Sequence, residues 1–438
     1  MGIRLKNQRF FNRKFVPVAQ IRRLRKGMVI KMNIIEGGVT AAQGFEAAGV
    51  EAAIKYQNRK DMAMVYSRVP CKAAGVFTSN VVKAAPVRWD QEVVAHSSYV
   101  QAVIVNSGIA NAATGRQGYD CCRQTADKAA QLLGISADAV LVASTGVIGS
   151  QLPIDRLLAG VEKLAESKAD TREAGTMAAE AIMTTDTISK QVAVQIELGG
   201  RTVTVGGMCK GSGMIHPNMC TMLGFITTDI AISKELLQEA LSEDVIDTFN
   251  MISVDGDTST NDTLVVLANG MAGNPEITTK NEDYKIFTEA LHYVDVTLAK
   301  LMAGDGEGAT ALFETKVIHA ASKEEARILS RSVIGSNLCK AAIYGHDANF
   351  GRFLCALGYS GVKFDPDQVE LYFENNEKSM LIYKDGVAAD YSEEEASKIL
   401  ASSEVRVLVD MHVGDAEATA WGCDLSYDYV KINADYRS

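Results

Sequence analysis

Near the middle of the chain the sequence reads Lys210-Gly-Ser-Gly-Met-Ile-His-Pro-Asn-Met-Cys-Thr-Met-Leu-Gly-Phe-Ile-Thr-Thr-Asp229. A loop broken by glycine and proline leads to Thr221, and the apolar run 222–226 follows it. A short apolar run after such a loop predicts a buried strand, with Thr221 as its first residue. A threonine hydroxyl is a weak nucleophile, but one beside its own free α-amine has a base attached. The segment therefore predicts a buried strand and a candidate nucleophile.

Strand and helix patterns alternate on both sides of this segment. Buried strands are predicted at 100–105, 140–143 and 264–267, and Gly199-Gly200 between the apolar runs 192–198 and 201–205 is the signal of a two-residue hairpin. Helices are predicted at 120–133, at 154–164 after Pro153, and after Ser322, where Glu325 completes a capping box. The mixture predicts an α/β fold with mixed sheets. No linker rich in proline or serine divides the chain, so the segment 210–229 is the best candidate boundary.

The composition excludes two classes of protein. The chain has 438 residues, of which 47% are hydrophobic and 22% charged, as is typical of a soluble globular protein. No apolar run approaches the roughly 18 residues that a membrane-spanning helix needs. The formal net charge of −10 argues against a general nucleic-acid binder. We therefore expect neither a membrane nor a nucleic acid as partner.

The basic residues are unevenly distributed. Residues 1–31 contain ten of the 44 lysines and arginines and none of the 54 acidic residues. Such a leader is either a transit peptide or the product of an upstream start codon, with Met28 or Met32 opening the protein. Met32 directly precedes the first globular pattern, which favours the second interpretation. We thus expect 1–31 to lie outside the fold and the protein to be cytoplasmic, or to enter the mitochondrial matrix if the leader is a transit peptide.

The cysteines and histidines show no metal-binding spacing. The eight cysteines are scattered without a CxxC pair, and the six histidines include no HxxxH pair. This pattern indicates reduced thiols and predicts no metal in catalysis. The stretch 206–212 lacks the order of a phosphate-binding loop, and 255–262 lacks the glycine and glutamate of a calcium-binding loop. The second stretch is better interpreted as an Asx turn.

Three further loops can carry chemistry if they meet at one site. The stretch 144–149, Ser-Thr-Gly-Val-Ile-Gly, follows a predicted strand, and its glycines allow backbone N–H groups to converge as an oxyanion hole requires. The stretch 305–310 carries two carboxylates that could serve acid–base chemistry or hold an amine. The last residues, 433–438, follow an aromatic run and are expected to be ordered. Each stretch alone is an ordinary turn or chain end, and spacing does not show whether they meet.

Together these stretches resemble the ArgJ family, the ornithine acetyltransferases (glutamate N-acetyltransferases) of arginine biosynthesis. The resemblance runs from Glu36-Gly-Gly-Val-Thr40 to the last residue. Its other blocks are Asn106-Ser-Gly-Ile-Ala-Asn111, Ser144-Thr-Gly146, Met183-Thr-Thr-Asp-Thr187, Lys210-Gly-Ser-Gly213, Asn218-Met-Cys-Thr-Met-Leu223, Asp255-Gly-Asp-Thr-Ser-Thr-Asn-Asp262, Asp305-Gly-Glu-Gly-Ala-Thr310, Asp347-Ala-Asn-Phe-Gly-Arg352 and the stretch 420–438. So many blocks in one order make a chance match implausible.

The resemblance implies a self-processed enzyme with a layered αββα fold like that of DmpA and ArgJ. The precursor would cleave itself between Cys220 and Thr221, giving an α chain (32–220) and a β chain (221–438) that starts with the nucleophile. Thr221 would take the acetyl group from N-acetylornithine and pass it to glutamate in a ping-pong cycle. Thr145 and Gly146 would form the oxyanion hole. The substrate contacts that carry over are Thr184, Lys210, Thr221, Glu307, Asn433 and Ser438.

Several points stay open from sequence alone. Cys220 stands where the family usually has alanine, which raises the question of processing speed, and Ser438 replaces threonine but keeps the hydroxyl. The main alternative is an aminopeptidase or amidase of the related self-processing superfamily, in which water replaces glutamate as acceptor. No cofactor is expected, and no residue decides whether acetyl-CoA also serves as donor. The resemblance further implies a heterotetramer of two α and two β chains.

Overall fold

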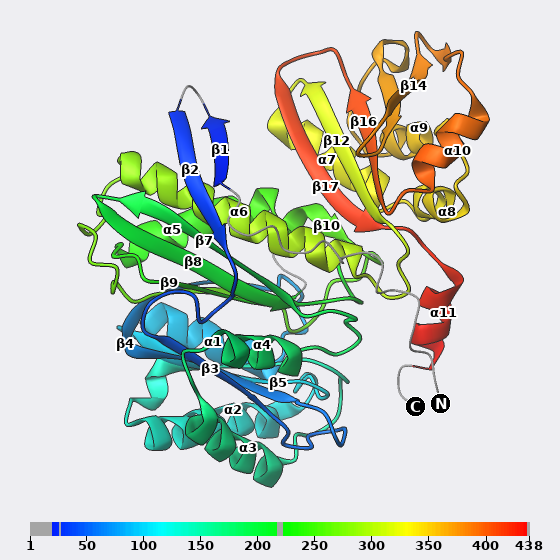
Figure 1. The fold of residues 1–438 in the computed structure, drawn as a ribbon. Coiled ribbons are helices and arrows are strands. Elements are labelled where there is room, and N and C mark those ends of the chain that lie inside the picture. The colour runs from blue at the N-terminus through cyan, green and yellow to red at the C-terminus, as the bar shows by residue number, and fades with distance from the viewer. Residues whose placement is uncertain (1–19, 26–27, 217–221, 436–438) are drawn as a thin grey trace.

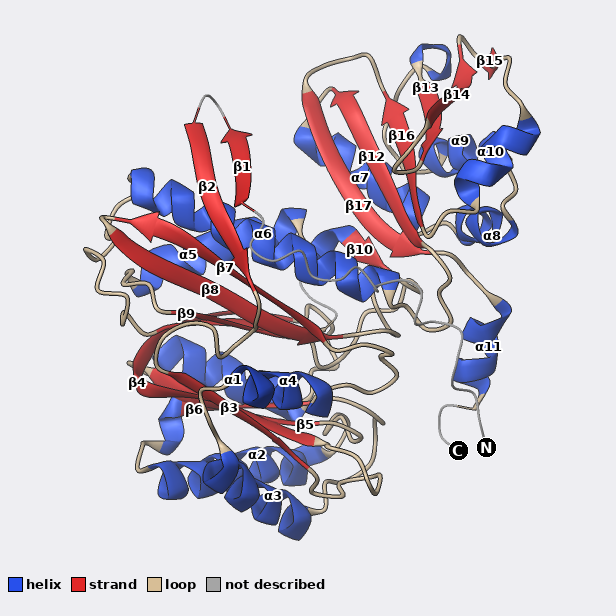
Figure 2. Cartoon of the chain, viewed as in Figure 1, coloured by secondary structure: helices blue, strands red, loops and turns tan. Residues whose placement is uncertain are grey.

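The structure, a computed structural model, describes residues 20–25, 28–216 and 222–435. Its strands form two mixed sheets, and Figures 1 and 2 show them on either side of the long helix α6. The first sheet contains β1 Gln20–Arg25, β2 Met28–Ile35, β3 Phe45–Val50, β4 Met62–Phe77, β5 Val100–Asn106, β6 Val140–Ser144, β7 Lys190–Leu198, β8 Arg201–Lys210, β9 Leu223–Thr228 and β11 Thr263–Ala268. The second contains β10 Ile252–Ser253, β12 Leu312–Ala320, β13 Glu370–Glu374, β14 Ser379–Lys384, β15 Val387–Ala388, β16 Glu404–Asp410 and β17 Ala416–Cys423.

The described residues also form α-helices. They are α1 Ala85–His96, α2 Gly115–Leu133, α3 Ile154–Ser167, α4 Arg172–Ala181, α5 Lys234–Asp244, α6 Glu282–Gly304, α7 Lys323–Ile334, α8 Asn337–Gly345, α9 Phe350–Gly358, α10 Glu393–Leu400 and α11 Tyr427–Ala434. None of the helices in the described ranges is long and apolar enough to cross a membrane.

The first sheet folds back into two layers at β4. The first half of this 16-residue strand pairs with β3 and β5, and its second half pairs with β11. Successive residues of the central strands then enter different cores: Phe225 and Val265 join the cluster between the two layers, whereas Ile226 and Val266 pack in the cluster that contains α6. Burial on both faces explains the continuous apolar runs. Helices α2 and α3 lie outside one layer and α5 and α6 outside the other, which confirms the predicted α/β fold with αββα layers (Figure 1).

Both sheets combine parallel and antiparallel pairs, as predicted. In the first sheet β5 pairs with β6 and β9 with β11 in parallel, while β7 and β8 form an antiparallel hairpin. Gly199 and Gly200 both have positive φ, 55° and 74°, as the predicted two-residue turn requires.

The predicted divisions of the chain fall inside this first sheet. The α/β boundary at 220/221 lies in the connection between β8 and β9, which are antiparallel neighbours. The predicted end of the leader at residue 31 lies within β2, which pairs with β7 through Asn33–Ile35. Cleavage at 220/221 would therefore divide the strands of one sheet between two chains; it would not separate two folded domains.

Asp90 supplies a test of this core. Its side chain on α1 is fully buried, Oδ1 accepts the Val142 N–H at 2.8 Å, and Oδ2 has no partner among the described residues. Burial raises the pKa of Asp90 well above its ordinary value, so the folded chain holds a proton there that the unfolded chain releases above a pKa of about 3.9. The stabilisation of the fold by this protonated carboxyl group is therefore complete below that pH and declines as pH rises towards the folded pKa.

The Asp90→Asn variant keeps the acceptor but needs no proton. We expect the difference between its thermal midpoint and that of the wild type to increase in favour of the variant from pH 5 to pH 8. The reason is that the unfolding free energy of the wild type falls by at most about 1.4 kcal/mol per pH unit as the unfolded chain releases the Asp90 proton. Thermal denaturation at the two pH values measures this difference. The same substitution at the exposed Asp127 serves as control. A midpoint difference for Asp90→Asn that does not change with pH would contradict a neutral Asp90.

Candidate active site

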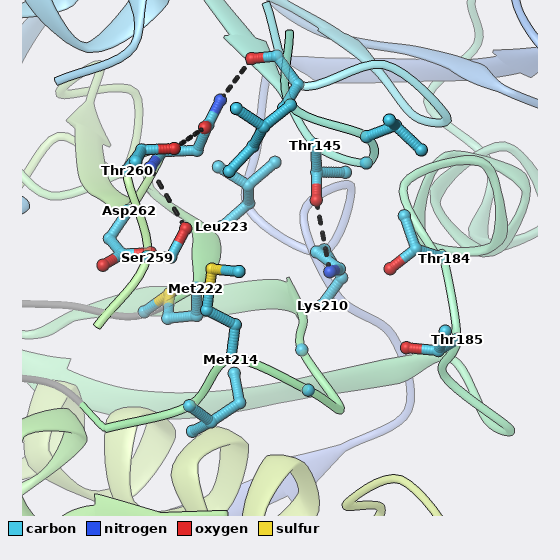
Figure 3. Close-up of a pocket in the computed structure, with 18 of the residues that line it drawn as sticks. Thr145, Thr184, Thr185, Lys210, Met214, Met222, Leu223, Ser259, Thr260 and Asp262 are labelled. Carbon is cyan, nitrogen blue, oxygen red and sulfur yellow. Dashed lines mark hydrogen bonds between the residues drawn. The ribbon is translucent and has the colours of Figure 1, made fainter. Parts of the chain in front are cut away.

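One pocket collects the loops at the ends of the central strands. Its volume is about 250 Å³, and it opens where β6, β8, β9 and the segment before β11 come together (Figure 3). The described residues that line it are Ala110, Thr145, Gly146, Val147, Ile148, Thr184, Thr185, Lys210, Gly211, Gly213, Met214, Ile215, Met222, Leu223, Ser259, Thr260, Asn261, Asp262, Glu307 and Asn433. Six predicted site residues therefore share one pocket although they span almost 290 positions of sequence.

The predicted oxyanion loop forms one wall. It follows β6, and the N–H groups of Thr145 and Val147 donate to the carbonyls of Asn106 and Gly108 at 3.0 and 3.1 Å. Gly146 has φ 131°, and a Cβ on it would lie 2.2 Å from the Gly108 carbonyl carbon. Only glycine fits such an approach, so the loop holds the Thr145 hydroxyl and the Gly146 backbone at the pocket by packing against the loop after β5.

Lys210, the last residue of β8, points into the pocket. Its Nζ donates to the Thr145 hydroxyl at 3.3 Å, and Figure 3 shows the pair between Met222 and Thr184. The side chain is almost fully buried, and burial lowers the pKa of Lys210 despite the nearby carboxylate of Asp186, 4.0 Å from Nζ. A buried ammonium with one distant counter-ion favours the binding of an anion such as an α-carboxylate.

Beneath the pocket lies an ion network that was not predicted from the sequence. The Nζ of Lys190, at the start of β7, contacts Asp186 Oδ1 at 2.7 Å and Asp305 Oδ2 at 2.6 Å. Burial alone lowers the pKa of Lys190, but the two carboxylates outweigh it and raise the pKa. Burial likewise raises the pKa of Asp186, but Lys190 and Lys210 outweigh it, so that the pKa falls below its ordinary value. These directions favour the charged forms of both Lys190 and Asp186.

The network joins three pocket loops. The Asp186 carboxylate accepts the Thr184 N–H at 3.0 Å and the Gly211 N–H at 2.7 Å. The Asp305 carbonyl accepts the Ser212 hydroxyl at 2.6 Å, and the Ser212 carbonyl accepts the Glu307 N–H at 2.9 Å. The positions of Thr184, Lys210 and Glu307 thus depend on one buried lysine and its two partners.

Glu307 and Asn433 also line the pocket. The Asn433 amide on α11 donates to Glu307 Oε2 at 2.7 Å, so the C-terminal helix contributes to the pocket, while 436–438 of the stretch predicted to be ordered lie outside the described residues. Gly213 lies against the carboxylate, since a Cβ there would be 2.4 Å from Glu307 Cδ. The Glu307 carboxylate lines the pocket, where it can bind the amine of a substrate.

Asp262 adds a neutral acid to the site. It precedes β11, its side chain is buried, and Oδ2 has no hydrogen-bond partner in the described part of the chain. Burial raises the pKa of Asp262 well above its ordinary value. The following residue, Thr263, donates its N–H to the Met222 carbonyl at 2.8 Å, which places Asp262 beside the start of β9. Burial therefore favours the protonated form of this carboxyl group over the ionised one.

Three predicted site residues lie outside the described residues: Cys220, Thr221 and Ser438. Met222, the residue after Thr221, lines the pocket. The strand after it begins at Leu223, two residues later than predicted.

The predicted Asx turn is confirmed: Asp255 Oδ1 accepts the Asp257 N–H at 3.3 Å, and the same carboxylate binds the N–H groups of Met214 and Ile215.

Comparison with known proteins gives one answer. The sequence model of the ArgJ family matches residues 46–438. The arginine biosynthesis bifunctional protein ArgJ of Symbiobacterium thermophilum is 53% identical over 412 residues, which are 93% of this chain and 100% of the relative. ArgJ 1 of Clostridium acetobutylicum is 50% identical over 402 residues, or 91% and 97% of the two chains.

A solved structure is also similar in sequence. Ornithine acetyltransferase of Mycobacterium tuberculosis, crystallised in complex with ornithine, is 44% identical over 43% of this chain and 99% of the solved one, with a TM-score of 0.40. The family match and the curated relatives decide the classification: this chain belongs to the ArgJ family.

Proposed function

We propose that the chain is a glutamate N-acetyltransferase of arginine biosynthesis, acting in the cytoplasm, which transfers acetyl from N2-acetylornithine to glutamate through an acetyl ester of Thr221. One observation carries the proposal: a hydroxyl and glycine pair, a buried ammonium and a carboxylate line one pocket that also contains the residue after Thr221. This set of groups fits an N-acylated amino acid with a carboxylate and a side-chain amine. The names of the curated relatives agree with it.

Maturation comes first in the proposed mechanism. The Thr221 hydroxyl attacks the Cys220 carbonyl carbon, the peptide C–N bond breaks, and the resulting ester is hydrolysed by water. The products are an α chain that ends with the Cys220 carboxylate and a β chain that starts with the Thr221 amine. That α-amine has a reference pKa of about 7.7–8.0, so at neutral pH it can accept the proton of its own hydroxyl.

Acetyl transfer then proceeds in two halves. Thr221 Oγ attacks the acetyl carbonyl, and the oxyanion forms between the Thr145 hydroxyl and the Gly146 N–H. The C–N bond breaks, ornithine leaves with the proton, and the α-amine of glutamate attacks the ester in the second half. Lys210 binds the substrate α-carboxylate and Glu307 the ornithine side-chain amine, while Thr184, Asn433 and Ser438 orient the substrate. The α and β chains of two precursors assemble into the heterotetramer.

A mass-spectrometric assay tests the reaction. Purified protein given N-acetylornithine and isotope-labelled glutamate is expected to form labelled N-acetylglutamate and ornithine in equal amounts. Release of acetate without N-acetylglutamate would support the amidase alternative instead. On a denaturing gel, two fragments of similar size are expected in place of one 47 kDa band. Replacing N-acetylornithine with acetyl-CoA in the same assay decides whether the second donor is used.

The oxyanion loop gives a prediction with an internal control. Gly146→Ala places a methyl group 2.2 Å from the Gly108 carbonyl carbon and must displace the loop. One oxyanion donor lowers the barrier by about 2.7–4 kcal/mol, so kcat is expected to fall by about 10²-fold or more. Gly149→Ala has the same kind of strain, with φ 86°, but no atom lies within 4 Å of its Cβ. Steady-state assays in which both variants lose activity equally would contradict this role of Gly146.

A further inference from the structure

Two histidines distant in sequence meet at the far end of the second sheet. His319 lies near the end of β12, and His412 follows β16 by two residues. These strands are parallel neighbours in which Ile318 is level with Asp410, so their carboxyl ends bring both histidines and Asp410 together. Figure 1 shows this end of the sheet opposite α11. About 23 Å of strand separates it from the start of β12, the end of the strand nearer the pocket residue Glu307.

The three side chains converge on one point. His319 Nδ1 lies 2.8 and 2.9 Å from the two Asp410 oxygens, and His412 Nδ1 lies 3.5 Å from Oδ1. One nitrogen or oxygen from each residue lies within 4.8 Å of the others. The donor atoms of a tetrahedral zinc site are about 3.3 Å apart, given metal–ligand distances of about 2.0–2.2 Å. The imidazoles of His319 and His412 are 51% and 45% exposed, which leaves room for the ring rotation that this spacing requires.

The surroundings hold the carboxylate and one imidazole in place. Asp410 is buried, and its Oδ1 accepts the backbone N–H of His412 at 3.1 Å. Glu370 Oε2 lies 3.6 Å from His412 Nε2, the ring nitrogen that would not face the metal. A carboxylate on the second nitrogen fixes the ring orientation of many metal-binding histidines. The site therefore has three candidate ligands and an outer partner.

The backbone at both histidines is unusual. His319 and His412 each have φ 52°, in the left-handed region that disfavours most side chains. His319 lies where the pairing of β12 with β17 shifts register, and its carbonyl accepts the N–H groups of Val413 and Gly414, both at 2.9 Å. These bonds hold the segment after β16 against the end of β12, so that both histidines lie beside Asp410.

We propose that His319, Asp410 and His412 bind one divalent transition-metal ion of the zinc class, outside the acetyl-transfer pocket. Two imidazoles and one carboxylate are the donors that zinc, nickel and cobalt accept, and water completes the coordination. Binding ties the ends of β12 and β16 together. The ion stabilises the second sheet and takes no part in acetyl transfer.

The test uses the untagged full chain freed of metal by a chelator. Calorimetric titration with Zn²⁺ is expected to show one equivalent bound, and Co²⁺ should give a visible absorption band that excess Zn²⁺ removes. His319→Asn and His412→Asn should each weaken Zn²⁺ binding at least tenfold and abolish the Co²⁺ band, with acetyl transfer unchanged. Asparagine tolerates the left-handed backbone, so these variants are expected to fold.

His346→Asn is the matched control. His346 is also exposed and has φ 54° at the end of α8, but it belongs to no such cluster among the described residues. Its variant should bind Zn²⁺ and Co²⁺ as the wild type does. The proposal is overturned if the wild type binds no Zn²⁺, or if both cluster variants keep wild-type affinity, which would place the ion at other surface groups such as the exposed Cys355.

Discussion

Replacement of Thr221 with alanine is expected to leave a single chain near 47 kDa and to abolish acetyl transfer. In the proposed mechanism this hydroxyl is the nucleophile that attacks the Cys220 carbonyl, so without it no Thr221 α-amine would be released. Loss of a covalent nucleophile in hydrolytic enzymes costs about 10⁴-fold or more in rate, so activity should fall at least that far. A denaturing gel and the labelled-glutamate assay measure the two effects on one preparation.

Two substitutions serve as controls for Thr221→Ala. Thr221→Ser retains a hydroxyl and should retain measurable cleavage and transfer. Cys220→Ala restores the residue usual in the family and should change only the speed of cleavage, with the transfer rate of the processed enzyme unchanged. If Thr221→Ala is still cleaved, or still forms N-acetylglutamate at the wild-type rate, then another residue is the nucleophile.

The elements of the first sheet could be predicted because burial on both faces leaves an apolar run. The runs at 100–105 and 264–267 appear as β5 and β11, within one residue of the predicted bounds. The start of α2 was predicted five residues too late, because 115–119 contains two glycines and lacks a standard cap. There the helix is held by Asn111, which accepts the Thr114 hydroxyl and donates to the Gly118 carbonyl. These two bonds do not follow a standard capping pattern, so the start of the helix carries no recognised sequence signal.

In the candidate site, too, some residues could be predicted from the sequence and others could not. Thr145, Lys210 and Glu307 were found through motifs that resemble a family, and the structure brings them into one pocket. Lys190 was missed because its two partners lie at positions 186 and 305, and only the fold places Asp305 beside it. Likewise no spacing rule relates His319 to His412, which become neighbours only when β12 and β16 pair.

Replacement of Lys190 with methionine is expected to destabilise the protein more than any other single change in the ion network. The substitution leaves the carboxylates of Asp186 and Asp305 buried without their common cation. Breaking a buried ion pair by removal of one partner costs about 3–5 kcal/mol of unfolding free energy. For a chain of 438 residues, whose unfolding entropy is about 0.9 kcal/mol/K, that corresponds to a fall of about 3–5 °C in the thermal midpoint.

Lys60→Met is the matched control, because Lys60 pairs with Glu180 at 2.8 Å but both side chains are exposed, 38% and 46%. An exposed pair contributes about 0–1 kcal/mol, so its loss should shift the midpoint little. Adding Asp305→Asn to Lys190→Met removes one of the two uncompensated charges and should recover part of the loss. Equal midpoints for Lys60→Met and Lys190→Met would contradict the buried network.

The same variant links stability to the pocket. In the wild type, Asp186 holds the N–H groups of Thr184 and Gly211, and Lys190 keeps that carboxylate ionised and in place. Without Lys190 the two carboxylates repel each other, and one must take up a proton or move towards solvent. As pH falls, protonation relieves this repulsion, so the midpoint deficit of Lys190→Met should shrink between pH 8 and pH 5.

Acetyl transfer should be impaired even below the melting transition, mainly through a raised KM, because Lys210 and Thr184 lose their common support. A variant with a lowered midpoint but a wild-type KM would mean that the network stabilises the fold without positioning the pocket.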